Sequence, residues 1–301
     1  MDHSHMLRGV FAPIVTPFRE DDTVSIPNLI ANIEKYNQTD LKGYMPLGSN
    51  GEFQGLTDEE SFRILDAVAQ SKAKDKVIVA GCGRESSYKT IEFIKKAADH
   101  GMDMAFILPP HYFVDRMSDE ALKAYYTDIA DKAAVPIVIY NGPKFAFNLS
   151  ISVDLMRALS THPNIIAMKN SSMHPNADYL AAIDPDIDFC LIAGNIKTFY
   201  PGISEGAVGG VLSTASWLPE YCCELYAHFI NGETQKAAEL HEYLNKLSSA
   251  SVGKHGVSGV KMGLDLRGMH GGRPRLPLLP VPKDEVERIA QLLKEEGISK
   301  V

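Results

Sequence analysis

The chain has 301 residues, of which 45% are hydrophobic, so it can bury a large core as one domain or as two small ones. Its formal net charge is −8, and the charged residues are spread along the sequence, which argues against nucleic acid as a partner. No apolar run reaches the roughly 18 residues of a membrane span and no basic amphipathic helix indicates a membrane surface, so we expect a soluble protein.

Both the amino terminus and the cysteines bear on location and on metal binding. Residues 1–6 read Met-Asp-His-Ser-His-Met, with no apolar segment behind a basic start, so we interpret them as a tag or cloning remnant and exclude their histidines as metal ligands. The four cysteines, Cys82, Cys190, Cys222 and Cys223, form no Cys-x-x-Cys pair. This usage predicts neither a disulfide framework nor a zinc site, and it favours a reducing, cytoplasmic location.

Strand-like and helix-like segments alternate along the chain from residue 9 onward. Apolar, β-rich runs predict strands at residues 9–18, 43–47, 76–81, 104–108, 135–140, 164–169, 189–193 and 207–214. Apolar residues at helical spacing predict helices at residues 28–38, from 58 onward, and at 87–100, 118–133, 152–160, 176–183 and 197–205. Eight alternations at a spacing of about 25 to 30 residues fit an α/β fold of the (β/α)₈ TIM barrel type better than a doubly wound sheet.

The strand pattern ends near Pro219. Beyond it, helical spacing predicts helices at residues 221–231, 234–249 and 283–296, with a connector rich in glycine and proline at 268–282. We therefore predict a barrel over residues 7–215 and a C-terminal helical extension over residues 216–301, packed on or beside the barrel.

The sixth predicted strand, residues 164–169, ends in an unusual residue. Four apolar residues, Ile165 to Met168, run directly into Lys169. Burial lowers the pKa of a lysine, and the neutral amine that results is a nucleophile toward carbonyl groups, which is the chemistry of a Schiff base. Taken alone, Lys169 is explained more simply as a strand-end lysine that extends its ammonium group into water.

The predicted barrel favours a catalytic role for Lys169 over an ordinary strand-end lysine, because the active site of such barrels lies at the carboxyl ends of the strands. Ser49, Asn50, Tyr112 and Tyr140 follow strand ends, as Lys169 does, so all five converge on one mouth. A phenol beside a Schiff base can both donate and accept the protons that imine chemistry moves, which makes Tyr140 a candidate acid and base. The turn formed by residues 48–51 offers backbone N–H groups to an anion, although, taken alone, it is explained more simply as a tight turn with no ligand.

Five motifs stand in a characteristic order along the chain: Phe11-x-Pro13-x-x-Thr16-Pro17, Gly48-Ser49-Asn50-Gly51-Glu52, Tyr140-Asn141-x-Pro143, Asn164-Ile165-Ile166-Ala167-Met168-Lys169 and Gly206-Ala207-x-Gly209-Gly210. In order and spacing they resemble the dihydrodipicolinate synthase / N-acetylneuraminate lyase family, whose members are class I aldolases on (β/α)₈ barrels. The resemblance covers nearly the whole chain from Gly9.

The resemblance implies roles for the residues at the barrel mouth. Lys169 would form an imine with pyruvate or another 2-oxo acid, and Tyr140 would be the acid and base beside it. Ser49, where most members have threonine, would join a hydroxyl relay, while Asn50 and the turn amides would bind the carboxylate. Tyr112 falls where the family inserts a tyrosine across a tight dimer, usually within a homotetramer. No metal and no organic cofactor is implied, and the substrate-binding residues would be Gly48, Ser49, Asn50, Phe145, Gly194 and Leu212.

Departures from the family pattern bear on the substrate. The synthases that make the lysine precursor carry an arginine at the position of Phe145, and a phenyl ring cannot replace a guanidinium group that holds a carboxylate. The Gly-Ser-Asn-Gly-Glu motif, Arg116-Met117-Ser118 and Gly271-Gly272 resemble 4-hydroxy-2-oxoglutarate aldolase. In contrast, Lys169-Asn170-Ser171-Ser172 resembles some N-acetylneuraminate lyases.

We therefore predict a carbon–carbon lyase that cleaves a 4-hydroxy-2-oxo acid to pyruvate and an aldehyde-type fragment, and we leave the second fragment open. A 2-oxo-3-deoxy sugar-acid dehydratase and an N-acetylneuraminate lyase use the same imine and stay as alternatives. A 4-hydroxy-tetrahydrodipicolinate synthase is disfavoured by Phe145, and a paralogue that only binds a 2-oxo acid is the non-enzymatic alternative.

Overall fold

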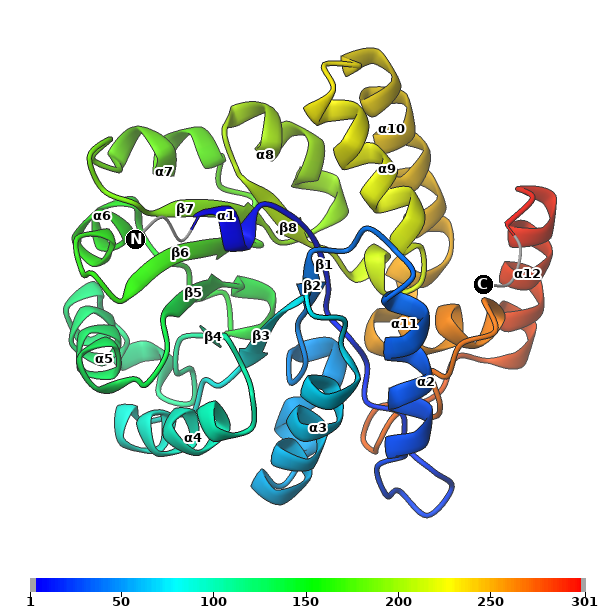
Figure 1. Ribbon diagram of the computed structural model, residues 1–301, viewed down its shortest axis with the longest axis horizontal. Coiled ribbons are helices and arrows are strands. Elements are labelled where there is room, and N and C mark those ends of the chain that lie inside the picture. Colours follow the sequence, from blue (N-terminus) through cyan, green and yellow to red (C-terminus); the bar gives the residue numbers. More distant parts are fainter. Residues whose placement is uncertain (1–3, 299–301) are drawn as a thin grey trace.

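Eight short parallel strands close on themselves in the order of the sequence, and helices surround them (Figure 1). The computed structural model describes residues 4–298. The strands are β1 (Gly9–Ala12), β2 (Gly43–Tyr44), β3 (Val77–Gly81), β4 (Met104–Ile107), β5 (Ile137–Asn141), β6 (Ile165–Asn170), β7 (Cys190–Ala193) and β8 (Gly209–Val211). The predicted (β/α)₈ barrel is therefore confirmed.

Helices alternate with these strands around the outside of the barrel. They are α2 (Ile26–Tyr36), α3 (Asp58–Ser71), α4 (Ser87–Asp99), α5 (Asp119–Lys132), α6 (Val153–Ser160), α7 (Asn176–Ala182), α8 (Phe199–Glu205) and α9 (Pro219–Ile230). The sequence signals where several of them begin. Side chains of Thr57, Ser86, Ser118 and Ser152 accept hydrogen bonds from the first turns of α3, α4, α5 and α6, and Glu60 completes a capping box on α3.

The barrel has two cores. An outer one lies between the strands and the surrounding helices, and an inner one fills the barrel with side chains that alternate along the strands, as the fold requires. The inner core includes Phe11, Met45, Val79, Phe106, Val138, Ile166, Ile192 and Val211. This packed interior closes the barrel below its mouth, so a ligand can enter only from the carboxyl ends of the strands.

Close backbone contact joins the first strand to the last. Gly209 pairs with Gly9 in the parallel register of β1 and β8. A Cβ atom on Gly209 would lie 2.1 Å from the carbonyl oxygen of Gly9, a distance that no real Cβ adopts, so glycine is required here. Gly209 of the fifth motif therefore serves barrel closure, whereas a Cβ on Gly210 would lie 2.8 Å from the Phe199 ring.

The chain beyond β8 is helical, as predicted, and packs on the barrel. Helix α9 contacts β1 and completes the ring, so the eighth barrel helix lies within the range predicted for the extension. The remaining helices are α10 (Thr234–Ala250), α11 (Gly256–Leu266) and α12 (Lys283–Glu295), the last of which lies farthest out (Figure 1). The sequence prediction missed α11, in which three glycines lower the helical propensity. Close packing explains one of them, because a Cβ on Gly263 would lie 3.1 Å from the Trp217 ring.

The amino-terminal segment was predicted to be a remnant outside the fold. Residues 1–3 of this segment lie outside the described residues. The short helix α1 (Ser4–Leu7) follows, in which Leu7 is fully buried and Met6 packs against the inner core.

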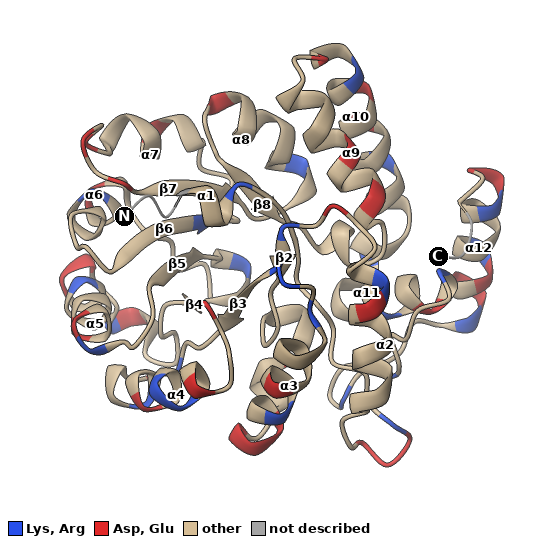
Figure 2. Cartoon of the chain, viewed as in Figure 1, with Lys and Arg blue, Asp and Glu red and all other residues tan. Residues whose placement is uncertain are grey.

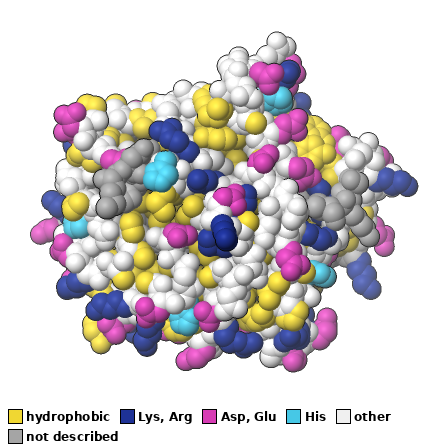
Figure 3. All heavy atoms as spheres, in the orientation of Figure 1, with side chains coloured by type: hydrophobic (Ala, Val, Ile, Leu, Met, Phe, Trp, Pro, Cys, Tyr) yellow, Lys and Arg dark blue, Asp and Glu magenta, His cyan; other side chains and the backbone are white. Residues whose placement is uncertain are grey.

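Charged side chains are distributed over the outer helices in both signs (Figure 2). On the face in Figure 3, acidic and basic side chains are interspersed and neither sign forms a continuous patch. Among residues 4–298, no helix is both long enough and apolar enough to cross a membrane. Within the same residues, the four cysteines are buried and form no disulfide.

Candidate active site

Strand register places Tyr140 next to Lys169. Residues Tyr140 and Lys169 are direct partners in the pairing of β5 with β6, as are Asn141 and Asn170. Because consecutive side chains of a strand point to opposite faces, the tyrosine and the lysine share the inner face while both asparagines share the outer one. The Lys169 Nζ lies 4.1 Å from the centroid of the Tyr140 ring.

Apolar groups surround the Lys169 amine. The residue is 4% exposed, and its Nζ lies 4.0 Å from Met45 Sδ and 5.8 Å from the centre of the Phe106 ring. Burial lowers the pKa of Lys169 to about 7, and no charged neighbour contributes to this shift. About half of the amine is therefore neutral at pH 7, against about 0.04% of an ordinary lysine.

The pKa of Tyr140 is shifted upward, in contrast to that of Lys169. Burial raises its pKa to about 12, and the hydroxyl groups of Ser171 and Ser49 act against this rise. The phenol therefore carries its proton at neutral pH and can donate it to a group bound at Lys169. The pair combines a neutral nucleophile with a protonated acid, which is the combination that imine formation needs.

The turn after β2 has an unusual backbone. A 3₁₀ turn, Ser49–Gly51, lies between Leu47 and Glu52, whose φ angles are 58° and 55°. Such left-handed conformations cost about 1 to 3 kcal/mol each and are frequent at functional sites. Within residues 4–298, the backbone N–H groups of Ser49 and Asn50 have no hydrogen-bond partner, so they are available to an anion.

The side chain of Asn50 is held in place by two hydrogen bonds. Its Nδ2 donates to Ser213 Oγ at 3.1 Å and to the carbonyl oxygen of Pro13 at 3.4 Å. Pro13 and Ser213 follow β1 and β8, so the turn after β2 is joined to the ends of these two strands.

These groups border one cavity of about 480 Å³ at the barrel mouth. Six of the residues predicted from the sequence line it: Ser49, Asn50, Tyr140, Phe145, Lys169 and Gly194. Glycine is required at position 194, since a Cβ there would lie 1.8 Å from Ser171 Oγ. The structure therefore brings Lys169, Tyr140 and the turn after β2 together at one cavity.

Three predicted residues lie elsewhere. Gly48 lines a small pocket next to the cavity, together with Ser49 and Tyr140. Leu212 is fully buried in the outer core and does not line the cavity, because it follows β8 with its side chain directed among the helices. Tyr112 is 77% exposed on the loop after β4, where its N–H donates to Glu85, and it does not reach the cavity of its own chain.

Several lining residues were not among the predicted site residues. Lys144, Ser171 and Lys197 border the cavity, and each follows a barrel strand, so the rule that identified Tyr140 would have found them. The far wall comes from the end of α10, from α11 and from the segment between them. Its residues include Ser248, Val252 and Val257, and the strand rule gives no signal for them.

Comparison with known proteins identifies the family of this chain. The model of the dihydrodipicolinate synthetase family matches residues 6–296. The chain belongs to this family. The 4-hydroxy-tetrahydrodipicolinate synthases of Methanothrix thermoacetophila and Methanosphaerula palustris are each 30% identical to it, over 289 and 292 residues. These matches cover 96% of this chain and 96% and 99% of the two relatives.

A solved structure is similar over the same span. The 4-hydroxy-tetrahydrodipicolinate synthase from the methanotroph Methylacidiphilum fumariolicum SolV is 26% identical, with a TM-score of 0.89 and 96% of each chain covered. The family predicted from the five motifs is therefore confirmed. Its members are lyases of the pyruvate-dependent class I aldolase type, so the chain is an enzyme of this type.

A buried ion pair connects the family's Gly-Ser-Asn-Gly-Glu turn to α11. Lys261 Nζ lies 2.6 Å from Glu52 Oε1, and the two side chains are 1% and 5% exposed. Lys261 also donates to the carbonyl oxygen of Arg273 at 2.8 Å and lies 4.3 Å from the centre of the Phe18 ring. Burial lowers the pKa of Lys261, and the nearby Glu52 carboxylate acts against this lowering.

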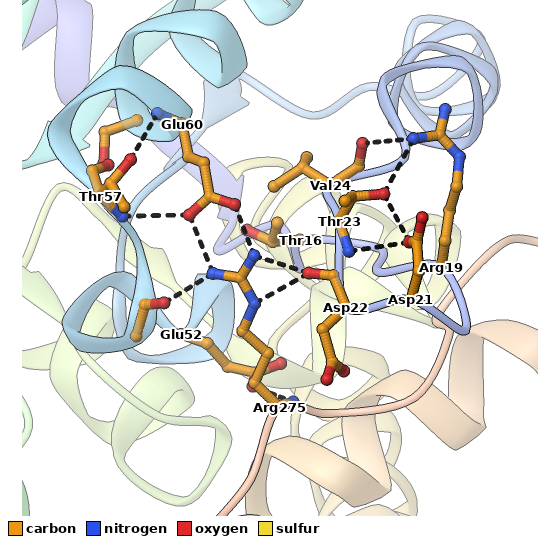
Figure 4. Close-up of polar contacts among 12 residues, drawn as sticks. Thr16, Arg19, Asp21, Asp22, Thr23, Val24, Glu52, Thr57, Glu60 and Arg275 are labelled. Atoms are coloured by element: carbon orange, nitrogen blue, oxygen red, sulfur yellow. Dashed lines mark hydrogen bonds and ion pairs between the residues drawn. The ribbon is translucent and has the colours of Figure 1, made fainter.

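Arg275 makes a second connection to the same turn (Figure 4). Its guanidinium group donates to the carbonyl oxygens of Gly55 and Asp22, at 2.6 and 2.7 Å, and pairs with the Glu60 carboxylate. Its backbone N–H donates to Glu52 Oε2 at 2.9 Å. The segment after α11 therefore holds the chain from the anion-binding turn to the start of α3.

The buried amine of Lys169 predicts a stability that depends on pH. Its folded pKa, about 7, lies below the ordinary value, so the folded state binds fewer protons and wild-type stability rises with pH above 7. Lys169→Met removes this cost and keeps an unbranched chain. We expect the free energy of unfolding to increase by roughly 3 to 5 kcal/mol at pH 6, and by less at pH 9, as measured by urea unfolding.

The same substitution at Lys261 is the matched control. Because Lys261→Met leaves the Glu52 carboxylate buried without a counter-charge, it should lower the free energy of unfolding by about 3 to 5 kcal/mol. A Lys169→Met variant that is also less stable than the wild type at pH 6 would show that the Lys169 amine is not desolvated.

Proposed function

We propose that this enzyme is a Schiff-base lyase that cleaves a 4-hydroxy-2-oxo acid to pyruvate and an aldehyde. The observation that carries the proposal is the Lys169 amine, whose pKa burial lowers to about 7, next to the protonated phenol of Tyr140. The anion-binding turn on β2 lies on the same cavity and takes the carboxylate of the 2-oxo acid.

The first half of the reaction forms the imine. Neutral Lys169 attacks the C2 carbonyl carbon, and a proton passes from its nitrogen to the oxygen. Tyr140 then donates its proton to this hydroxyl group, which leaves as water and gives a protonated imine and a tyrosinate. The positive imine lies beside the phenol and stabilises the tyrosinate, which offsets the effect of burial on the Tyr140 pKa.

The second half breaks the carbon–carbon bond. The Tyr140 oxygen takes the proton of the C4 hydroxyl, the aldehyde carbonyl forms at C4, and the electron pair of the C3–C4 bond passes through C3 to the imine nitrogen. Tyr140 then protonates C3 of the enamine. Water adds to C2 with loss of a proton to Tyr140, and collapse of the carbinolamine releases pyruvate and free Lys169.

A second candidate, favoured by the names of the relatives, is 4-hydroxy-tetrahydrodipicolinate synthase activity. Lys144 borders the cavity next to Phe145 and supplies a cation near the position at which the sequence lacks the synthase arginine. The Phe145 ring, whose centre lies 6.4 Å from that of Tyr140, still gives this wall an apolar surface without a bidentate donor. The lyase therefore stays the leading proposal.

A substrate panel distinguishes these reactions. Incubation with 4-hydroxy-2-oxo acids should give pyruvate, measured by coupling to lactate dehydrogenase, whereas a dehydratase would convert 2-oxo-3-deoxy sugar acids to 2,5-dioxo products without pyruvate. Pyruvate plus aspartate semialdehyde should give little cyclised product. Efficient cyclisation together with slow cleavage of every panel member would replace the lyase by the synthase.

Chemical trapping tests the imine itself. Borohydride added with pyruvate should attach a three-carbon unit to Lys169, found by peptide mapping, and Lys169→Ala should abolish both the adduct and turnover. The initial trapping rate should rise between pH 6 and pH 8, because the neutral fraction of an amine of pKa about 7 rises from about one tenth to about nine tenths. Lys144→Gln and Lys197→Gln should still be labelled at Lys169; a label on either of those lysines in the wild type would refute the mechanism.

We further propose a tight dimer within a homotetramer. Large apolar side chains are exposed on the loops at the barrel mouth and on the connector before α12: Tyr112 (77%), Phe113 (66%), Phe147 (73%), Leu276 (71%) and Leu279 (70%). Such exposure is typical of protein–protein interfaces. In this assembly the phenol of Tyr112 joins the proton relay of a second copy.

Tyr112→Phe tests this arrangement. Turnover should fall by about 10²-fold or more, because the relay loses a hydroxyl group, while the folded state and the association seen in sedimentation stay unchanged. Tyr88→Phe, at an equally exposed tyrosine on α4, is the matched control and should keep full activity. A wild-type protein that is monomeric and fully active at assay concentration would disprove the proposal.

A further inference from the structure

An acidic side chain is buried at the end of the turn to which we assign the substrate carboxylate. Glu52 follows the 3₁₀ turn Ser49–Gly51 directly, and its N–H donates to the carbonyl oxygen of Ser49 at 3.2 Å. Only 5% of the Glu52 side chain is exposed. A buried negative charge repels an anion bound nearby, because burial keeps water and salt from screening it. A turn that binds a carboxylate therefore needs a cation to compensate Glu52.

Lys261 of α11 is placed to supply that cation. Its Nζ lies 2.6 Å from Glu52 Oε1, and within residues 4–298 neither side chain forms another ion pair. The other groups close to the amine are neutral, namely the carbonyl oxygen of Arg273 at 2.8 Å and the Phe18 ring. As a pair, the two side chains carry no net charge.

Other charged side chains near this pair are already engaged. The Arg275 guanidinium group pairs with Glu60, and the backbone N–H of Arg275 donates to Glu52 Oε2 at 2.9 Å (Figure 4). Asp265, which also belongs to α11, accepts hydrogen bonds from two backbone N–H groups of the loop that follows. Lys261 is therefore the cationic side chain that contacts Glu52.

Helix α11 contacts both the active-site cavity and the turn. Val260 lines the cavity, and the next residue, Lys261, faces Glu52. Ser49 and Asn50, which offer their N–H groups to an anion, line the same cavity, whereas neither member of the ion pair does. The pair therefore acts on a bound carboxylate through the turn and through its charge, and not by contact.

Resting on the lyase function proposed above, we infer that Lys261 is a positioning residue for the substrate. By neutralising Glu52, it allows the turn after β2 to bind the carboxylate of the 2-oxo acid. Removing Lys261 alone leaves a negative charge beside the bound carboxylate, whereas removing Glu52 alone leaves none. A pair that served only to brace the turn would give the same loss whichever member was removed.

Pyruvate and pyruvamide test this inference, because they have nearly the same shape and differ in charge. Their dissociation constants are measured by calorimetry at pH 9, where a buried carboxyl group without a cation ionises. At this pH the Lys169 amine, with a pKa of about 7, is neutral and does not attract pyruvate. The wild type should bind pyruvate more tightly than pyruvamide.

The variants should change this preference in different directions. Lys261→Met should lower the preference about three- to tenfold, and Glu52→Gln should not lower it. The double variant, which has no charge at either position, should return to within about twofold of the wild type. Should Lys261→Met fail to fold, the other two variants still decide the question, because a lowered preference in either would overturn the inference.

Arg267→Met is the matched control. Arg267 is a second buried cation at the end of α11, 5% exposed, but it pairs with Glu220 of α9 and not with the turn. Its removal should lower stability and leave the preference unchanged. An unchanged preference in folded Lys261→Met, or equal binding of the two ligands by the wild type, would also refute the role of Lys261.

Turnover gives a second measurement. Because the pair acts on carboxylate binding, Lys261→Met should raise the KM of a 4-hydroxy-2-oxo acid about three- to tenfold and leave kcat within about twofold. A fall in kcat with KM unchanged would contradict the inference. Absence of pyruvate release from every such acid would refute the lyase proposal, while the ratios for pyruvate and pyruvamide would still decide the role of the pair.

Discussion

Burying the Lys169 amine without a counter-charge is unfavourable, and the rest of the barrel is arranged so that this burial persists. The strand that carries it is paired on both sides, with Tyr140 and Ile192 as its direct neighbours, so the backbone cannot move to hydrate the amine. Below it the inner core is closed by Met45 and Phe106. The apolar interior therefore does more than stabilise the barrel, because it lowers the pKa of the amine.

The protein contains a second buried lysine, Lys261, which, unlike Lys169, has an acidic partner. Lys261 is even less exposed than Lys169, yet it faces the Glu52 carboxylate and the Arg273 carbonyl oxygen. A lysine with such partners remains an ammonium group and serves as a structural cation. The difference between the two lysines is thus a difference in neighbours. Glu52, at the left-handed end of the turn after β2, is paired with Lys261, whereas no aspartate or glutamate among residues 4–298 lines the cavity beside Lys169.

Much of the fold could be predicted from the sequence, because apolar runs typical of strands alternate with apolar residues at helical spacing. Serine and threonine caps also mark where several helices begin. Lys169 and Tyr140 could be identified from the sequence because each ends an apolar strand. Their contact could not be predicted, because it depends on the register between β5 and β6, which is fixed only in the folded sheet. Helix α11 was missed because its glycines lower the helical signal; they are tolerated where the chain packs tightly, as at Gly263 against Trp217. Lys144 follows β5 as Phe145 does, but it was not among the predicted site residues, because the departure from the family pattern lies at position 145.

Residues 248–260 form one wall of the cavity, and they are synthesised after all of the barrel strands. During synthesis all eight strands leave the ribosome before this segment does, so a barrel could close while its mouth is still open to water on one side. In that state the cavity lacks one wall, and the Glu52 carboxylate lacks its ion-pair partner Lys261. The cavity of this enzyme is therefore complete only when the carboxyl-terminal part of the chain has docked on the barrel.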